Sequence, residues 1–238
     1  MNTALKTGLL AAAMTLSTPF VAFAEESSNP LPGTVTGNIA ITNNYIFRGV
    51  TQTTNNAAVQ GGLDWDTGMG FHAGTWASSV NFNDGNLATT ELDLYAGYGG
   101  KIDSFSYDLG FTYYWYPGAP SAANYNLWEV YGKAGYDFGV ASLTAYVAYT
   151  PENFGNTGSA TYTSLAFGIP VSDLFSVSGG VGYWMLTKGF KDQTDWNVGA
   201  TLKIYDWFDV DARYYDSDVS FLGNLADDKF VVKFSRAF

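Results

Sequence analysis

The sequence predicts an all-β fold, a transmembrane antiparallel up-and-down β-barrel of about twelve strands. Apolar and polar residues alternate through segments of about ten residues, long enough for a tilted strand to cross a bilayer. The connections between these segments alternate between short and long, and the chain ends on an alternating strand rich in Phe. We therefore expect short periplasmic turns, longer extracellular loops and both termini on the periplasmic side.

The composition excludes several classes of protein. Of the 238 residues, 17% are aromatic, only 14% are charged and none is Cys. Few charges among many aromatic residues argue against a disordered chain and against an ordinary soluble surface. The formal net charge of -11 argues against nucleic acid as a partner. Without Cys, a disulfide scaffold and a thiolate metal site are excluded.

The first 24 residues have the pattern of a secretory signal peptide. Lys6 supplies the positive charge, residues 8–16 the apolar core, and Ala22-Phe23-Ala24 a small-x-small cleavage site. The expected organisation is a signal peptide at 1–24, a flexible leader at 25–33 and the barrel at 34–238. No later stretch approaches the ~18 consecutive apolar residues of a transmembrane helix. We expect export to the cell outer membrane.

The first six strands are expected near 35–48, 57–66, 70–82, 91–98, 105–115 and 128–138. The third alternates poorly, and its outward parity stays open. For the other five, the apolar parity carries Val35, Ile39, Ile41, Tyr45 and Phe47; Val59, Leu63 and Trp65; Leu92, Leu94, Ala96 and Tyr98; Phe105, Tyr107, Leu109, Phe111, Tyr113 and Trp115; and Trp128, Val130, Ala134, Tyr136 and Phe138. A period of two predicts that each set shares one face of its strand.

Six further strands continue the pattern, the eighth less regularly than the others. Their apolar parity carries Leu143, Ala145, Val147 and Tyr149; Leu165, Phe167 and Ile169; Phe175, Val177, Val181 and Tyr183; Trp196, Val198, Ala200, Leu202 and Ile204; Phe208, Val210, Ala212 and Tyr214; and Phe230, Val232, Phe234 and Phe238. Trp65 and Trp207 fall near tight turns and Trp115, Trp128 and Trp196 near long loops, which predicts aromatic girdles at two interfaces. Trp184 has the opposite parity.

Charged residues fall almost entirely on the polar parity. A charge facing lipid at the bilayer midplane costs about 2–4 kcal/mol, so this separation favours an apolar exterior and a polar lumen. Arg236 is the one charged residue on the apolar parity, and its place near the chain end lets it reach the interface. The predicted lumen-lining residues are Arg48, Asp64, Glu91, Asp93, Asp108, Glu129, Lys133, Asp195, Lys203, Asp209, Asp211, Arg213, Lys229 and Lys233, with Asp66 and Asp137 on the same parity.

The connections sort into two kinds. Those near 67–68, 99–103, 139, 170–173 and 205–206 are tight, whereas those near 49–56, 83–88, 117–124, 151–159, 187–194 and 216–227 are longer. This sorting is the plan of an outer-membrane barrel, and a β-sandwich has no reason to adopt it.

The closing strand, residues 228–238, is a further indication of a closed barrel. An exposed aromatic edge strand at a chain end invites aggregation, and pairing with the first strand would remove that edge. The edge strand of a soluble sandwich is the alternative. The end of this strand, with Phe230, Phe234 and Phe238, resembles the closing strand of bacterial outer-membrane barrels. The resemblance implies that these three residues are the signal read by the barrel-assembly machinery.

Three short blocks near the N-terminus carry a more specific resemblance. They comprise Tyr45, Phe47, Arg48, Gly49 and Gln52; Gln60, Gly61, Gly62 and Asp64; and Gly74, Thr75, Trp76, Ala77 and Ser78. Together they resemble the Y-x-F-R-G-x-[ST]-Q, Q-G-G-x-D and G-T-W-A-S blocks of the TorF family of proteobacterial porins, which implies an outer-membrane barrel without a settled substrate. We expect Arg48 to pair with a lumen carboxylate in preference to binding anions at the mouth.

No catalytic pattern is present in the sequence. His72 is the only His, and G-x-S-x-G, H-E-x-x-H, P-loop and EF-hand spacings are absent. We therefore expect no enzymatic activity, no cofactor and no metal.

The leading functional hypothesis is an outer-membrane porin-like channel for passive passage of small solutes or ions. The alternatives are a closed structural or adhesion barrel plugged by its own side chains, and a soluble, exported, lectin-like sandwich. The expected partners are outer-membrane lipid, the barrel-assembly machinery through the C-terminal strand, and small solutes or ions. Ten acidic and six basic lumen positions predict a preference for cations if the pore is open.

Overall fold

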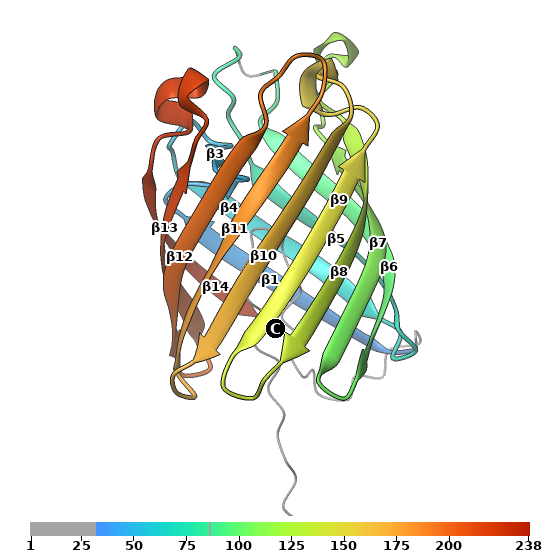
Figure 1. Ribbon diagram of the computed structural model, residues 1–238, viewed down its shortest axis with the longest axis vertical. Helices are drawn as coiled ribbons and strands as arrows, with labels where there is room; N and C mark the ends of the chain where they lie inside the picture. Colours follow the sequence, from blue (N-terminus) through green and yellow to red (C-terminus); the bar gives the residue numbers. More distant parts are fainter. Residues whose placement is uncertain (1–31, 86) are drawn as a thin grey trace, which may run out of the picture.

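Twelve antiparallel strands close into one barrel in the computed structural model, which describes residues 32–85 and 87–238 (Figure 1). They are β1 (Thr34–Thr42), β4 (Ala58–Asp66), β5 (Phe71–Ser79), β6 (Thr90–Ile102), β7 (Phe105–Trp115), β8 (Leu127–Asp137), β9 (Ser142–Thr150), β10 (Ala160–Pro170), β11 (Phe175–Leu186), β12 (Gln193–Ile204), β13 (Phe208–Ser217) and β14 (Lys229–Ala237). The predicted fold class is confirmed. The expected signal peptide, and the expected leader up to residue 31, lie outside the described residues.

The first and last strands close the barrel. Asn38 faces Ala237 and Thr42 faces Lys233 in the β1–β14 register. At the very end, Gly37 and Phe238 exchange two backbone hydrogen bonds of 2.8 and 2.9 Å. A Cβ on Gly37 would lie 2.6 Å from the Phe238 ring, so glycine here leaves room for the terminal aromatic side chain. Pairing with β1 therefore removes the exposed edge that the last strand would otherwise present.

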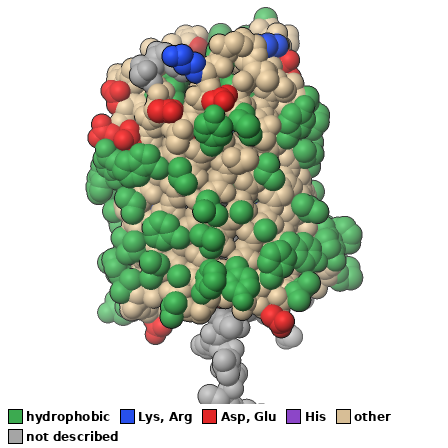
Figure 2. Space-filling model, in the orientation of Figure 1, with side chains coloured by type: hydrophobic (Ala, Val, Ile, Leu, Met, Phe, Trp, Pro, Cys, Tyr) green, Lys and Arg blue, Asp and Glu red, His purple; other side chains and the backbone are tan. Residues whose placement is uncertain are grey.

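The two faces of the wall differ as the alternation predicts. Outward side chains such as Ile41 and Leu109 are 57% and 63% exposed, whereas the inward Glu91 is 2% exposed. Figure 2 shows hydrophobic side chains spread over the wall, with the charged side chains of this view toward the two ends. Arg236, the outward exception, donates to the Trp207 carbonyl oxygen at 3.0 Å, near the tight-turn end. The exterior is therefore apolar and the interior polar.

The tryptophans follow the predicted girdles with defined exceptions. Trp115, Trp128 and Trp196 are exposed on the outside near the long connections, and Trp207 is exposed near a tight one. Trp65 lies at the tight-turn end of β4, where its Nε1 donates to the Pro32 carbonyl oxygen at 2.9 Å. The inward members are Trp184 on β11 and Trp76 on β5, which are half-buried and buried.

Connections of two lengths separate the two ends of the barrel (Figure 1). The tight ones cover 67–70, 103–104, 138–141, 171–174 and 205–207, and the longer ones cover 43–57, 80–89, 116–126, 151–159, 187–192 and 218–228. Short 3-10 turns lie within the longer set, at η1 (Ser121–Ala123), η2 (Phe154–Asn156) and η3 (Ser220–Leu225). Across 32–85 and 87–238, no helix is long and apolar enough to span a bilayer.

The first predicted strand is wrong in its second half. It was expected to run to residue 48, but β1 ends at Thr42, and the chain then forms an inner hairpin of β2 (Ile46–Phe47) and β3 (Val50–Thr51). Tyr45 is only 8% exposed and Phe47 is half-buried, so neither belongs to the outer face as expected. The reversal occurs at two residues with positive φ, Arg48 (48°) and Gly49 (80°), the conformation of a two-residue hairpin turn.

The structure shows which face is inward on β5 and β10, the two strands whose alternation is irregular in the sequence. On β5, Trp76 and Ser78 are buried in the interior while Phe71 and Ser79 are exposed, which settles the parity that the sequence left open. On β10, the buried side chains include Tyr162 and Ala166. Because these inward residues are aromatic or small, the strand lacks the polar parity that marks the others.

Candidate functional site

The inner hairpin crosses the barrel lumen near the long-loop end. It leaves β1, yet Arg48 at its tip contacts side chains of β8, β10 and β11. In the order of strands around the barrel, β9 stands opposite β1, and β8 and β10 flank β9. The hairpin therefore reaches the far wall and narrows the mouth of the lumen.

The Arg48 guanidinium is held by a carboxylate and three aromatic rings. Its Nη2 donates to Glu129 Oε2 at 2.8 Å, and Tyr114 donates to the same oxygen at 3.1 Å. Its Cζ lies 4.6 Å from the ring centroid of Phe47, 4.4 Å from that of Tyr162 and 4.8 Å from that of Trp184. The expected pairing of Arg48 with a lumen carboxylate is thus confirmed, and both partners are almost fully buried.

The base of the hairpin is fixed by Asn and Thr side chains. The Oδ1 of buried Asn44 accepts hydrogen bonds from Thr51 at 2.6 Å and Thr53 at 3.1 Å, and its Nδ2 donates to Asn55 at 3.1 Å. Asn43 accepts a hydrogen bond at 2.7 Å from the Val232 amide of β14. These hydrogen bonds give the buried polar side chains at the base of the hairpin their partners and fix its position relative to β14.

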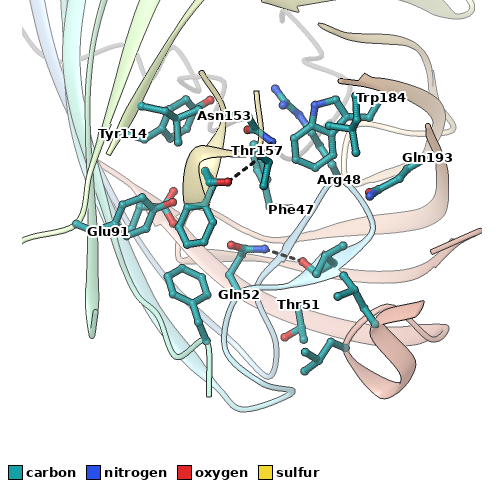
Figure 3. Close-up of a pocket in the computed structure, with 18 of the residues that line it drawn as sticks. Phe47, Arg48, Thr51, Gln52, Glu91, Tyr114, Asn153, Thr157, Trp184 and Gln193 are labelled. Carbon is teal, nitrogen blue, oxygen red and sulfur yellow. Dashed lines mark hydrogen bonds between the residues drawn. The ribbon is translucent and has the colours of Figure 1, made fainter. Parts of the chain in front are cut away.

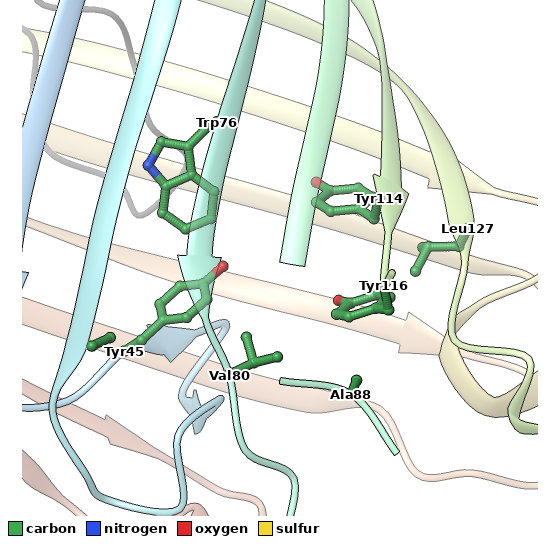
Figure 4. Close-up of a cluster of buried hydrophobic side chains, with 8 residues drawn as sticks. Tyr45, Trp76, Val80, Ala88, Tyr114, Tyr116 and Leu127 are labelled. Carbon is green, nitrogen blue, oxygen red and sulfur yellow. The ribbon is translucent and has the colours of Figure 1, made fainter. Parts of the chain in front are cut away.

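An aromatic cluster packs the hairpin against the wall of β5 and β7 (Figure 4). Tyr45 meets Trp76 edge-on, with ring centroids 5.4 Å apart, and its hydroxyl donates to Glu91 Oε1 at 3.2 Å. The buried members are Tyr45, Ala58, Trp76, Val80, Ala88, Tyr114, Tyr116 and Leu127. This cluster ties the hairpin to the near wall, as Arg48 ties it to the far one.

The three blocks of the TorF resemblance come together at this place. The first forms the hairpin, the second lies on β4 and the third on β5. Besides the contact of Tyr45 with Trp76, the Asn81 amide just after β5 donates to the Gln52 carbonyl oxygen at 2.8 Å. Blocks separated in sequence therefore build one structural unit.

A cavity of about 350 Å³ lies between the hairpin and the long loops (Figure 3). Glu91 stands on one side of it and Gln193 on the other, with Phe47 and Arg48 between them. Its lining comprises Phe47, Arg48, Val50, Thr51, Gln52, Thr54, Asn81, Phe82, Glu91, Tyr114, Tyr116, Leu127, Glu129, Asn153, Phe154, Thr157, Trp184, Leu186, Phe190, Gln193, Leu222 and Leu225. The volume is that of a small-molecule site.

Tyr116, in the connection after β7, stays protonated at this cavity. Burial, and next the charges of Glu91 and Asp93, raise the pKa of its hydroxyl well above the usual range. This hydroxyl also lies beside the Glu91 carboxylate. It therefore remains a hydrogen-bond donor at any physiological pH.

The middle of the lumen carries a second buried arginine. Arg213 is 1% exposed, and it donates to Asn197 Oδ1 at 2.7 Å, Ser178 Oγ at 2.8 Å and Asp211 Oδ2 at 3.0 Å. Asp211 also faces Lys233 across the β13–β14 pair. Charge at this level is thus paired within the wall.

Toward the tight-turn end, a third set of polar side chains lies on the inner face of the barrel. His72 Nε2 lies 3.0 Å from Asp108 Oδ2, and the Tyr95 hydroxyl donates to Asp64. Lys133 lies directly across from Asp108 in the β7–β8 register. The predicted lumen residues therefore form separate levels along the axis.

Most of the remaining predicted lumen residues lie away from the hairpin and its cavity. Asp195 lies there, accepting from Tyr162 at 3.1 Å, but Lys203 is exposed near a tight turn and faces half-buried Asp209. Lys229 donates to the Asp227 carbonyl oxygen at 2.6 Å at the long-loop end. Asp66 and Asp137 are exposed where β4 and β8 end. These residues line the two rims.

Sequence reasoning did not single out Tyr114, Tyr162, Trp184 and Gln193 as site residues. Inward parity near a long loop was the available signal for the first three. Within 32–85 and 87–238, no group of three or more His, Asp or Glu side chains could hold a metal ion.

Comparison with known proteins gives one family and several related folds. The model of a family described as "Bacterial protein of unknown function (Gcw_chp)" matches residues 24–238. No curated protein matches this chain significantly in sequence.

Solved structures similar to this chain include porins. The KdgM porin in complex with disordered oligogalacturonate gives a TM-score of 0.61 at 9% identity, covering 86% of this chain and 99% of that one. The NanC porin gives 0.55 at 10% identity, covering 86% and 98%. An outer membrane channel from Pseudomonas putida F1 gives 0.51 at 13% identity, covering 89% and 97%. At such identities the likeness concerns the fold.

Proposed function

The chain belongs to the Gcw_chp family of bacterial proteins of unknown function, and we propose that it is an outer-membrane, porin-like channel for passive passage of small solutes or ions. One observation carries the proposal: a closed twelve-stranded barrel has an apolar outside, a charged inside and a mouth narrowed by its own hairpin. Apolar residues facing lipid and polar residues facing the lumen are the arrangement of a membrane-spanning barrel. The porin-like fold supports it.

The hairpin limits what could pass. Arg48 and Glu129 bridge the lumen near the mouth, and Arg213 lies buried against β11 and β12 deeper in the barrel. A twelve-stranded barrel is intermediate between barrels filled by side chains and the wide porins of 16–18 strands. The proposed cargo is therefore small.

We also propose that the chain is a member of the TorF family, that residues 1–24 are a cleaved signal peptide, that the protein resides in the outer membrane and that it has no enzymatic activity. Assembly through Phe230, Phe234 and Phe238 also belongs to this proposal; these three side chains are exposed on the outside of β14 and at the chain end. An exposed aromatic ridge beside the closing seam is a suitable surface for recognition before closure.

A closed structural or adhesion barrel is the second candidate. The buried Arg48–Glu129 pair and the buried network around Arg213 favour it, because both place satisfied polar side chains inside the barrel.

Single-channel recording of the refolded protein in planar bilayers separates these two functions. Thr42 and Ala58 are direct cross-strand partners, so an Asn-Gly turn can replace residues 43–57 without altering the sheet. We expect discrete conductance steps in the wild type and larger steps in the shortened variant. A silent wild-type protein that is folded by circular dichroism would overturn the channel proposal in favour of the closed barrel.

A further inference from the structure

We propose that the mouth cavity binds a small organic cation with an apolar or aromatic body. The inference rests on the proposed function in one respect, because it names the substrate class of that channel. The binding itself can be measured without any transport.

The first argument is a buried carboxylate with an unused oxygen. Glu91 lines the cavity and is 2% exposed; its Oε1 accepts from Tyr45, and the Tyr116 hydroxyl lies beside the carboxylate, but Oε2 makes no hydrogen bond with the described residues. Asp93, two positions further on the same inner face, is also buried and has an unpartnered Oδ1. Buried charges in proteins are ordinarily paired, because isolation from water costs several kcal/mol. A cationic group in the cavity would supply the missing partner.

The second argument is that the positive charge beside the cavity already has its partners. Arg48 is the one basic side chain among the described residues lining the cavity, and its guanidinium is already committed to Glu129 and three rings. An anion would therefore meet the Glu91 carboxylate without a free counter-charge. The local field favours a cation.

The third argument is the wall of the cavity. Phe82, Tyr114 and Phe154 line it together with aliphatic side chains of the loops, and Phe82 packs edge-on to Phe154 with centroids 5.1 Å apart. Aromatic faces attract cations and bury apolar bodies at the same time. Bare metal ions would gain little from such walls, whereas an organic ammonium would use both features.

The fourth argument concerns the end of the cavity opposite Glu91. Gln193 is 8% exposed, extends toward the cavity in Figure 3, and has an Oε1 without a hydrogen-bond partner. It offers an acceptor across the cavity from Glu91. The site thus suits a ligand with a donor at each end and an apolar middle.

Isothermal titration calorimetry of the refolded barrel with benzylammonium, benzyl alcohol and benzoate tests the proposal. These probes share one ring and differ in charge. We expect benzylammonium to bind about tenfold more tightly than benzyl alcohol, because a charge-assisted hydrogen bond is stronger than a neutral one. Benzoate should bind most weakly. Equal binding of all three would overturn the proposal.

Three variants assign the effect to the cavity. Glu91→Gln, which keeps the side-chain shape, should abolish the difference between cation and alcohol. Phe82→Leu should weaken benzylammonium binding several-fold through loss of a ring face. Glu152→Gln is the matched control, because Glu152 is an exposed loop carboxylate outside the cavity lining, and its binding should equal that of wild type. Unchanged selectivity in folded Glu91→Gln protein would overturn the proposal.

The outcome separates this inference from the channel proposal. Cation binding in a protein that shows no conductance would sustain the site and refute the channel. Conductance without selective cation binding would do the reverse.

Discussion

Arg48 Nη2 lies 2.8 Å from Glu129 Oε2, although 81 positions separate the two residues in the chain. The pair joins the tip of the inner hairpin to the opposite wall of the barrel. Both side chains are almost inaccessible to solvent, at 4% and 2% exposure. This one contact therefore fixes how far the hairpin extends across the lumen.

A double-mutant cycle should show strong coupling between these residues. Arg48→Met leaves the Glu129 carboxylate buried and unpaired, which we expect to cost about 3–5 kcal/mol of unfolding free energy. Glu129→Gln in the same chain should recover a large part of that loss, because no isolated charge remains. Denaturant unfolding in lipid vesicles, followed by Trp fluorescence, measures all four proteins. Additive losses would contradict the coupling.

Ion selectivity should favour cations. The ten acids and six bases expected on the lumen parity leave a difference of four negative charges. Near the mouth, the Oδ1 of buried Asp93 has no hydrogen-bond partner among the described residues. Reversal potentials across a salt gradient should show cation preference that weakens toward ~1 M salt, where the Debye length is only ~3 Å.

A pair of variants localises this selectivity. Asp93→Asn should reduce it more than Asp137→Asn, since Asp137 is exposed at the tight-turn rim and screened by solvent. Anion preference in the wild type would contradict the expectation, and so would equal effects of the two substitutions.

A loop contact outside the strands should be lost only in acid. The Gly158 amide donates to Glu152 Oε1 at 2.7 Å, and Lys188 Nζ lies 3.1 Å from the same oxygen. The backbone hydrogen bond first, and then Lys188, lower the pKa of the Glu152 carboxyl. A lowered pKa means that the contact stabilises the loop above the ordinary carboxyl pKa and is lost as pH falls through the lowered value.

The Gly158 amide shift in NMR spectra reports this titration directly. We expect its midpoint below the ordinary Glu value of about 4.3. In Glu152→Gln protein the shift should stay flat across the same range. A midpoint at or above the ordinary value would contradict the assignment. The exposed position makes the contact sensitive to salt.

Closure of the barrel should depend on the space above Gly37. A Cβ there would lie 2.6 Å from the Phe238 ring, whereas a Cβ on Gly132 would first meet the Leu109 side chain at 3.3 Å. Gly37→Ala should therefore destabilise the folded barrel by about 1–3 kcal/mol, as overpacking does. Gly132→Ala is the control, with a smaller effect expected.

Unfolding midpoints in vesicles check the comparison. Neither glycine has a positive φ, so backbone strain does not enter the difference. Adding Phe238→Ala to Gly37→Ala should relieve the clash, and a double variant no more stable than additivity predicts would argue against it.

The signals that predicted the barrel are local. A period of two along β6 or β12 reports which side chains share a face, and that requires no knowledge of distant residues. The connections likewise carry their length in the sequence. For this reason the strand number, the sorted loops and the apolar exterior could be predicted.

The prediction from sequence was wrong for the segment after β1, where the chain leaves the barrel wall and enters the lumen. Tyr45 and Phe47 keep the parity of β1, so alternation reads the same whether the strand continues outward or turns inward. The pair Arg48-Gly49 between Phe47 and Val50 was the one local hint, because both adopt positive φ in the turn. Trp76 was ambiguous for a similar reason: an aromatic residue suits either face, and its partner Tyr45 comes from the hairpin.

By itself, the sequence determined the architecture: an antiparallel closed barrel with an apolar outside and a charged inside. Only the tertiary structure decided that the segment after β1 enters the lumen, that Arg48 meets Glu129, and that Glu91 and Gln193 border one cavity. The physical reason is one of range. Face and turn follow from residues a few positions apart, whereas charge pairing and cavity shape depend on strands brought together by closure.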